Sequence, residues 1–128
     1  MTPDLAWAAG LFEGEGCVRV NHRADKRNPK RHLYHGLTLS IGMCDREPLD
    51  TFAEAAGVGK VMGPYGPYGK PHHSPFFSYA LHGKVAARVM EGLLPWLSQR
   101  RRQQYTDVLS ELVGLGVDVQ SWLHEGDE

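Results

Sequence analysis

Asp4-Leu-Ala-Trp-Ala-Ala-Gly-Leu-Phe-Glu-Gly-Glu-Gly16 predicts a short helix that ends in two acids. Asp4 suits the N-cap, since its carboxylate can accept a hydrogen bond from a free N–H group of the first turn. The apolar residues recur at the spacing of one helix face. They are Leu5, Ala8, Leu11 and Phe12.

A second face of this helix carries almost no side chain. Ala6, Gly10 and Gly14 are four residues apart. A glycine inside a helix costs about 0.5–1 kcal/mol relative to alanine, so two of them on one face need a reason. Close approach of a second helix backbone is such a reason, and it is best known from helices in membranes.

The acids Glu13 and Glu15 lie where the helix ends. Carboxylates at a helix C-terminus face the negative end of the helix dipole, at a cost of about 0.3–1 kcal/mol each. A bound divalent cation would offset that cost, because carboxylate oxygens suit Mg²⁺. The acids alone are equally compatible with an ordinary surface helix that has a glycine cap.

The composition indicates one globular domain. The chain has 128 residues, of which 41% are hydrophobic and 23% are charged. No apolar run approaches the length of a membrane span, and the first residues lack the pattern of a signal peptide. Cys17 and Cys44 form no disulfide framework. We therefore expect an intracellular protein without a membrane partner.

The charges are segregated, although the net charge is only −1. Residues 19–35 contain six Lys or Arg and one acid, whereas residues 107–128 contain six acids and no Lys or Arg. This separation favours contact between the basic segment and a polyanion such as nucleic acid. A solvated basic loop is the alternative for this segment taken alone.

The remaining periodicity predicts an α-β-β-α-β-β-α-α order within a single domain at 1–113, followed by a partly disordered acidic tail at 114–128. Alternation marks strands, helical spacing marks helices, and Gly and Pro mark turns. After the first helix the predicted elements are strands 17–23 and 34–43, a helix 45–57, strands 58–64 and 76–82, a helix 84–97 interrupted at Pro95, and a helix 100–113.

Ala8-Ala-Gly-Leu-Phe-Glu-Gly-Glu-Gly16 resembles the nine-residue motif of the LAGLIDADG homing endonucleases and related intron maturases. Small residues stand second and third, apolar residues fourth and fifth, acids sixth and eighth, and glycine last. The predicted order agrees with that family across about residues 4–113. The resemblance implies an α+β fold of α-β-β-α-β-β-α type, in which helices cover one face of a four-stranded antiparallel saddle sheet.

Family members with one motif act as homodimers, so the resemblance implies a homodimeric Mg²⁺-dependent endonuclease that makes a double-strand break in a long pseudo-palindromic site and serves intron or intein mobility. Glu15 matches the metal-binding acid, the Gly14 carbonyl is a second ligand, and about two or three Mg²⁺ ions per dimer are implied, with Mn²⁺ as a substitute. Arg100 matches a basic residue near the scissile phosphate, and Arg101 or Arg102 is an alternative. The implied dimer interface contains Ala6, Ala9, Gly10, Glu13 and Gly14.

The resemblance also implies that the polar face of the sheet lies in the major groove of double-stranded DNA. A ten-residue strand spans about 33 Å, or about ten base pairs, so two sheets would cover about twenty. Strand arginines can read guanine and asparagine can read adenine, whereas the basic turn would hold phosphates. The predicted DNA contacts are Arg19, Asn21, Arg23, Lys26, Arg27, Lys30, Arg31, Tyr34, Thr38, Ser40, Lys60 and Ser78.

One position departs from the family. Many members carry a polar amide near the metals at the end of the second strand, where this chain has Met43. This keeps open a non-cleaving binder of the same fold, either a maturase that binds RNA or a DNA-binding regulator. A protein-interaction domain would leave the strand arginines and the bare helix face unexplained. His72-His73 and the two cysteines lack zinc-ligand spacing, so no zinc site is expected there.

Overall fold

The computed structural model describes residues 4–24, 33–66 and 75–124. Ten elements follow one another along these segments. They are α1 (Leu5–Glu15), β1 (Gly16–Ala24), β2 (Leu33–Met43), α2 (Arg46–Ala56), β3 (Val61–Tyr65), β4 (Phe76–His82), α3 (Gly83–Leu93), the 3₁₀ turn η1 (Leu94–Trp96), α4 (Gln99–Gly114) and α5 (Gln120–His124).

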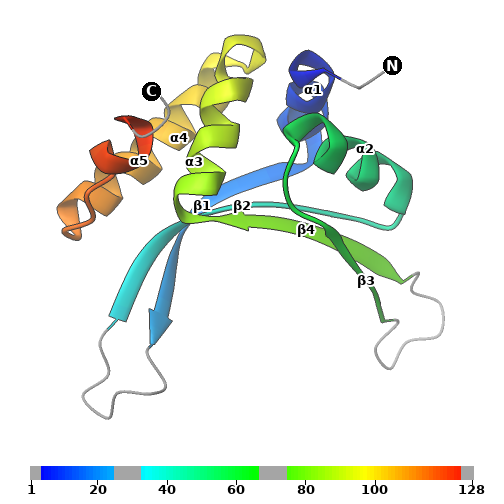
Figure 1. Cartoon of the computed structure of the whole chain (residues 1–128), viewed down its shortest axis with the longest axis horizontal. Helices are drawn as coiled ribbons and strands as arrows, with labels where there is room; N and C mark the ends of the chain where they lie inside the picture. Colours follow the sequence, from blue (N-terminus) through cyan, green and yellow to red (C-terminus); the bar gives the residue numbers. More distant parts are fainter. Residues whose placement is uncertain (1–3, 25–32, 67–74, 125–128) are drawn as a thin grey trace.

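The four strands form one antiparallel sheet in the order β1-β2-β4-β3. The sheet bends into an arch, and all the helices lie above its convex face (Figure 1). The two ends of the arch extend downward beyond the helical layer. One of these ends is the β1–β2 ribbon, whose two strands pair without a break from Gly16↔Ile41 to Ala24↔Leu33.

The core fills the space between the helices and the convex face of the sheet. Phe12 of α1, Phe52 of α2 and Tyr79 of β4 are all completely buried. The Phe52 and Tyr79 rings meet edge to face at 5.3 Å, and the Tyr79 hydroxyl donates to the Val58 carbonyl at 2.7 Å. Burial raises the pKa of Tyr79 to about 12, so this hydroxyl stays protonated and keeps donating at neutral pH.

The predicted α+β class and four-stranded antiparallel sheet with helices on one face are confirmed. The side-chain oxygens of Asp4 and Asp45 accept backbone N–H groups at the starts of α1 and α2, as N-caps do. Gly57, with a φ of 74°, ends α2 in the left-handed region that favours glycine. Among the residues that the structure describes, no helix is both long and apolar enough to cross a bilayer.

The structure extends the folded domain beyond residue 113, where the sequence analysis ended it. Residues 114–124 include α5, which packs against α3. Val119 is only 3% exposed and belongs to the core, so this part of the predicted tail is folded. Short elements with few apolar residues give a weak periodic signal, which is why the helix was missed.

Gly16 links α1 to β1 at a point where a side chain has no room. A Cβ atom there would overlap the buried Phe12 ring. We predict that Gly16→Ala lowers the free energy of unfolding by about 1–3 kcal/mol, because Phe12 must leave its packed position. Gly36→Ala, whose Cβ would meet nothing within 4 Å, is the control and should change stability by less than about 0.5 kcal/mol in urea denaturation. Equal losses in both variants would contradict this packing argument.

Candidate functional site

Helix α1 is packed on one side and bare on the other. Ala8, Ala9 and Phe12 are completely buried. Gly10 and Gly14 are exposed, and a Cβ atom at either would meet nothing within 4 Å. Trp7 is also exposed, and Trp7, Gly10 and Gly14 stand at positions i, i+3 and i+7, so the three share one face of the helix. This bare face allows another backbone to approach closely.

The predicted interface residues of α1 divide between these two sides. Gly10 and Gly14 lie on the bare face, and Ala6 is half-buried beside them. Ala9, however, is 0% exposed, so the prediction that places it in an interface between subunits is wrong for this structure. Its methyl group is already used in packing α1 inside its own chain.

Glu13 joins the end of α1 to the start of α4. The Ser98 backbone N–H and hydroxyl donate to the two Glu13 carboxylate oxygens at 2.6 and 2.9 Å. Arg101 donates through Nε and Nη2 to the Glu13 carbonyl at 3.2 and 3.0 Å, and its guanidinium lies 5.3 Å from the Phe12 ring centroid. Glu13 therefore has a structural role within one chain, and its place in the dimer interface stays a prediction.

The same contacts change the acidity of Glu13. Its pKa lies below the usual value of 4.5, chiefly because the Ser98 backbone N–H stabilises the carboxylate. The Ser98 hydroxyl and the charges of Arg101 and Arg100 act in the same direction, while burial opposes them. Because Ser98 is also the N-cap of α4, the carboxylate sits at the positive end of that helix.

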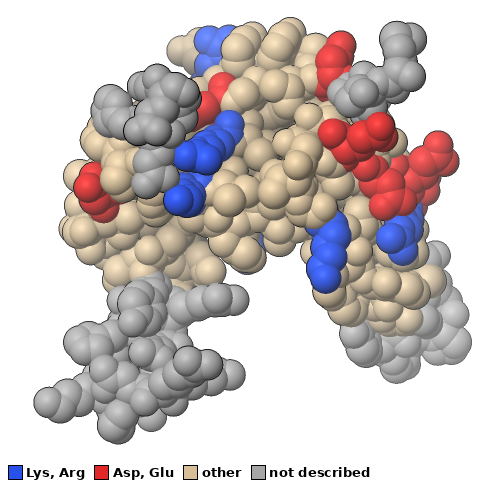
Figure 2. All heavy atoms as spheres, viewed as in Figure 1, with Lys and Arg blue, Asp and Glu red and all other residues tan. Residues whose placement is uncertain are grey.

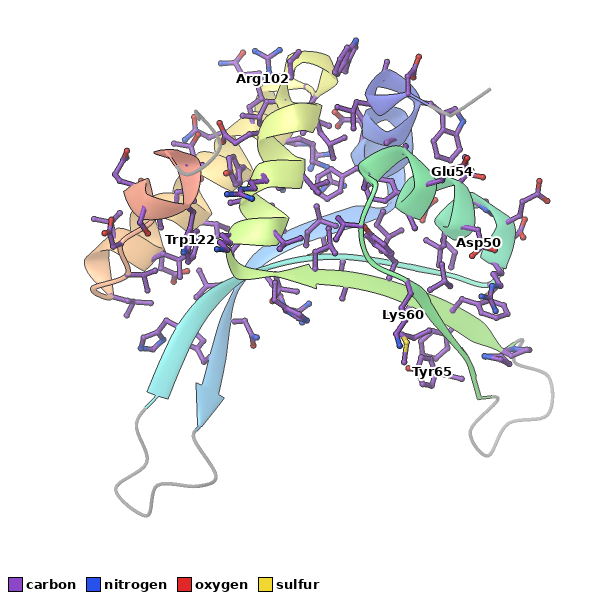
Figure 3. The ribbon with its side chains drawn as sticks, in the orientation of Figure 1. Asp50, Glu54, Lys60, Tyr65, Arg102 and Trp122 are labelled. Atoms are coloured by element: carbon purple, nitrogen blue, oxygen red, sulfur yellow. The ribbon has the colours of Figure 1, made fainter. Side chains whose placement is uncertain are left out.

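The three arginines at the start of α4 differ in their availability. Arg101 is 11% exposed and is held by Glu13, while Arg102 donates to the Leu97 and Pro95 carbonyls. Arg100 is 64% exposed, with its Nη2 atom 3.8 Å from a Glu13 carboxylate oxygen. Figure 3 shows Arg102 at the top of the helical layer, opposite Lys60 on the sheet side. Of the three, Arg100 is the one able to reach another molecule without losing a hydrogen bond to its own chain.

Glu15 is the last residue of α1 and is exposed. It lines a shallow hollow together with Gly42, Met43, Cys44 and Phe76. The structure thus brings Met43 beside Glu15, as the family pattern implied for the end of the second strand. Within the described segments, no three His, Cys, Asp or Glu side chains come together in a group that could hold a metal ion.

The concave face of the sheet carries a polar row across three strands. Arg19 of β1 pairs with Thr38 of β2, which pairs with His82 of β4, so the three side chains project from one face. The Thr38 hydroxyl lies 3.1 Å from the His82 Nδ1 atom.

Figure 2 shows acidic side chains gathered over α2, above the hollow underside of the arch.

Most predicted DNA-contact residues of the described strands lie on this face, with one correction. Arg19 and Lys60 are exposed, and Asn21, Ser40 and Ser78 are half-buried. Thr38 projects from the same face but is only 1% exposed, so its predicted direct contact with DNA is wrong for this structure. Its hydroxyl is instead hydrogen-bonded to His82.

Six further predicted contacts cannot be placed by their side chains. Arg23 and Tyr34 are cross-strand partners in backbone register, and the structure describes no more of them. Lys26, Arg27, Lys30 and Arg31 lie outside the described residues.

Comparison of the sequence finds no matching family model and no matching curated protein. Solved structures do match. The homing endonuclease I-TnaI has a TM-score of 0.64 at 15% identity, over 91% of this chain and 76% of its own. The LAGLIDADG meganuclease I-CpaMI, bound to uncleaved DNA, has a TM-score of 0.65 at 15% identity, over 89% of this chain and 38% of its own.

This is the fold of the LAGLIDADG homing endonucleases. The homing endonuclease I-CvuI, in complex with its target in the presence of Ca, also matches with a TM-score of 0.62 at 18% identity. The match covers 82% of this chain but only 63% of I-CvuI, so this chain spans less than two thirds of the length of that relative.

The polar face of this LAGLIDADG fold contains residues that the sequence analysis did not select. His82 belongs to it by register with Thr38, and Met62 and Phe76 share the face of Ser78 and are 45% and 42% exposed. A histidine at a strand end and apolar residues beside turns give no distinct sequence signal. The pairing register is what reveals them.

The Glu13 contacts give a stability prediction. Glu13→Gln should lower the free energy of unfolding by about 1 kcal/mol at pH 7, since the charge-assisted hydrogen bonds are partly exposed. Because the pKa is lowered on folding, this contribution is present above the unfolded pKa of 4.5 and is lost as the pH falls through the lower folded pKa. Urea denaturation across this pH range should therefore show the wild type and the variant converging at low pH.

The matched control for this measurement is Glu54→Gln, which changes an exposed acid of α2 and should shift stability by less than about 0.5 kcal/mol. A wild type and Glu13→Gln variant of equal stability at pH 7 would show that the carboxylate does not hold α4 to α1.

Proposed function

We propose that this protein is a homodimeric, Mg²⁺-dependent, site-specific DNA endonuclease. The observation that carries the proposal is one helix, α1, whose bare exposed face ends at the exposed carboxylate of Glu15. If two such helices pair, the Glu15 carboxylate of one chain lies near the Glu15 carboxylate of the other. The LAGLIDADG fold and the DNA-bound state of I-CpaMI support the choice of substrate. Activity in intron or intein mobility is part of this proposal.

The dimer is proposed to form across a two-fold axis beside α1. Two-fold contacts place the same surface of each chain against its copy. Gly10 and Gly14 leave room for backbone contact, and Trp7, 42% exposed, supplies apolar area on the same face. Such a contact would bury the tryptophan and place both Glu15 side chains near the axis.

The metal is proposed to lie between the two Glu15 carboxylates, with the Gly14 carbonyl oxygens as additional ligands. Carboxylate and carbonyl oxygens are the donors that Mg²⁺ prefers, and like charges brought together would otherwise repel. When bound, Mg²⁺ supplies a polarised water and stabilisation of the leaving oxygen. About two or three ions per dimer, with Mn²⁺ as a substitute, remain the predicted complement.

The DNA is proposed to lie in the hollow of the arch. Arg19 presents a guanidinium that can read guanine through two hydrogen bonds, and Asn21 presents an amide that can read adenine. Lys60, exposed before β3, and the basic turn at 24–33 would hold phosphates. Arg100 is proposed to approach the scissile phosphate, because its side chain is 64% exposed whereas that of Arg101 is only 11% exposed.

A non-cleaving binder of DNA or intron RNA is the second candidate. The observation that favours it is Met43, which lines the hollow beside Glu15 and offers only a weak thioether acceptor. An amide at this position could orient a water, and methionine cannot donate a hydrogen bond to one. Both candidates use the same DNA-facing strands, so cleavage is the property that separates them.

We predict that Glu15→Gln retains DNA binding but loses Mg²⁺-dependent cleavage. Removing the charge removes the ligand that holds the metal, and losses of about 10²–10³ or more in rate are typical for an electrostatic catalytic group. The target is first selected by binding from a randomised pool of palindromic duplexes of about twenty base pairs. Strand cleavage of the selected duplex is then measured with Mg²⁺ and with EDTA.

Glu54→Gln is the control for this experiment, since it also removes one exposed acid but lies on α2. It should cleave as the wild type does. Equal Mg²⁺-dependent cleavage by wild type and Glu15→Gln would remove Glu15 from the mechanism. Tight binding by the wild type without any cleavage would favour the non-cleaving binder.

We predict that Gly10→Leu yields a folded monomer. The monomer has space for the side chain, because a Cβ atom at Gly10 meets nothing within 4 Å. In the dimer the leucine would occur twice at the closest approach, and overpacking of about 1–3 kcal/mol per copy weakens association at least about thirtyfold. Sedimentation measures the association, and circular dichroism checks the fold.

Ser110→Leu is the matched control, because it adds the same side chain at an exposed position of α4 away from α1. It should leave the dimer intact. A wild type that remains monomeric both free and on DNA would contradict the proposed arrangement.

A further inference from the structure

His22 and His35 meet across the β1–β2 ribbon. They are cross-strand partners in register, and their rings pack edge to face with centroids 4.8 Å apart. Their two Nδ1 atoms are only 2.7 Å apart. The same nitrogen of each ring therefore points at the other, with His22 exposed and His35 half-buried.

This pair does not belong to the proposed DNA-binding face. His22 lies two residues after Val20, and His35 lies two residues before Leu37, which is buried in the core. Because side chains alternate along a strand, the two histidines project from the side of the sheet opposite to Arg19 and Asn21. In the register of β1 and β2 they also lie beyond the Arg19↔Thr38 pair, toward the Ala24↔Leu33 end of the ribbon and away from Glu15.

Two chemical arrangements bring two Nδ1 atoms this close. In one, a single proton is shared, so that one ring donates and the other accepts. In the other, both nitrogens bind one metal ion. Nitrogen ligands about 2.0–2.1 Å from a metal are about 2.9 Å apart at a right angle and about 3.4 Å apart at a tetrahedral angle. The observed 2.7 Å is a hydrogen-bond distance and is slightly shorter than either metal-bound spacing, so a metal would replace the shared proton and widen the pair.

We propose that His22 and His35 form a site for a borderline divalent transition-metal ion, with water completing the coordination shell. Imidazole suits Ni²⁺, Cu²⁺ and Zn²⁺, and the right-angle ligand positions of Ni²⁺ and Cu²⁺ need a smaller widening of this pair than tetrahedral Zn²⁺ does. Among the residues that the structure describes, no third His, Cys, Asp or Glu joins the pair. The site is therefore an open one with two protein ligands, which Mg²⁺, a cation that prefers oxygen, would not occupy.

Occupation of this site would fasten the two strands to each other. A two-stranded ribbon without a covering layer is marginally stable on its own. A ligand that binds only the paired state stabilises that state by mass action. The metal would thus hold the register of the ribbon that carries Arg19 and Asn21 on its opposite face. The ribbon would bind the ion whether or not the protein cleaves DNA.

The test is calorimetric titration of the full chain with Ni²⁺. It is done with Cys17 and Cys44 replaced by serine, because both thiols are exposed and can bind the same ions. We expect one equivalent bound per chain and a rise in Tm of several degrees. His22→Phe and His35→Phe keep a ring at each position but remove the ligand. Each should bind Ni²⁺ at least about tenfold more weakly, since even loss of a supporting group costs about that much.

Two controls separate this pair from three of the five other histidines. His82→Ala removes an exposed histidine of the same sheet, and the double variant His72→Ala/His73→Ala removes the only adjacent pair in the sequence. Both should bind as the wild type does. Nitrogen-15 NMR of the imidazoles should show Ni²⁺ broadening the Nδ1 signals of His22 and His35 first. Undetectable binding, or equal binding by wild type and His22→Phe, would overturn the proposal and leave the shared proton as the only link between the rings.

Discussion

The attachment of Glu13 to the start of α4 fixes where the last turn of α1 lies. The carboxylate accepts two hydrogen bonds from Ser98, and the Glu13 carbonyl accepts two from Arg101. Below it, Phe12 is completely buried. The turn is therefore held from the helical layer and from the core at once. Glu15 follows two residues later and is exposed, so its carboxylate is presented to solvent at a defined place.

The two faces of the sheet have different roles: one packs against the core and the other carries polar side chains. One face supplies Leu37, Leu39 and Ile41 to the core, and the other carries Arg19 and His82 on the hollow side of the arch. Alternation along each strand makes this separation automatic. Toward the Ala24↔Leu33 end of the ribbon the same face as Leu37 carries His22, which is exposed, and His35, which is half-buried, instead of further apolar residues. A polar pair that bonds to itself suits such a position better than two exposed aliphatic side chains.

Much of this could be predicted because α1 and the strands carry local signals. Each of these signals depends on residues that are close together in the sequence. They are Asp4 as a cap, the glycines of the bare face and the alternation of 34–43. Thr38 shows the limit of such reading. Alternation assigns it to the polar face, but it does not reveal that its neighbours in a central strand leave it 1% exposed. Ala9 fails for a similar reason, since small residues suit both a helix interface and a tightly packed core.

The contacts that were missed join distant parts of the chain. Ser98 meets Glu13 across 85 residues, and no periodicity predicts that pairing. His22 and His35 could be paired only once the register of β1 and β2 was known, and a turn of about ten residues leaves that register open.

Two kinds of metal chemistry can coexist in one small fold when ligand type and position both differ. Glu15 offers oxygen at the end of a helix and next to a bare face, which suits a hard cation shared between two chains. His22 and His35 offer nitrogen within one chain and on the other side of the sheet from the proposed DNA contacts Arg19 and Asn21. Carboxylate oxygens are poor ligands for the ions that imidazole prefers, and imidazole nitrogens are poor ligands for a hard cation such as Mg²⁺. As proposed, the hard site needs a second subunit, whereas the nitrogen pair needs only the correct strand register, so dimer formation would govern the former and folding of the ribbon would govern the latter.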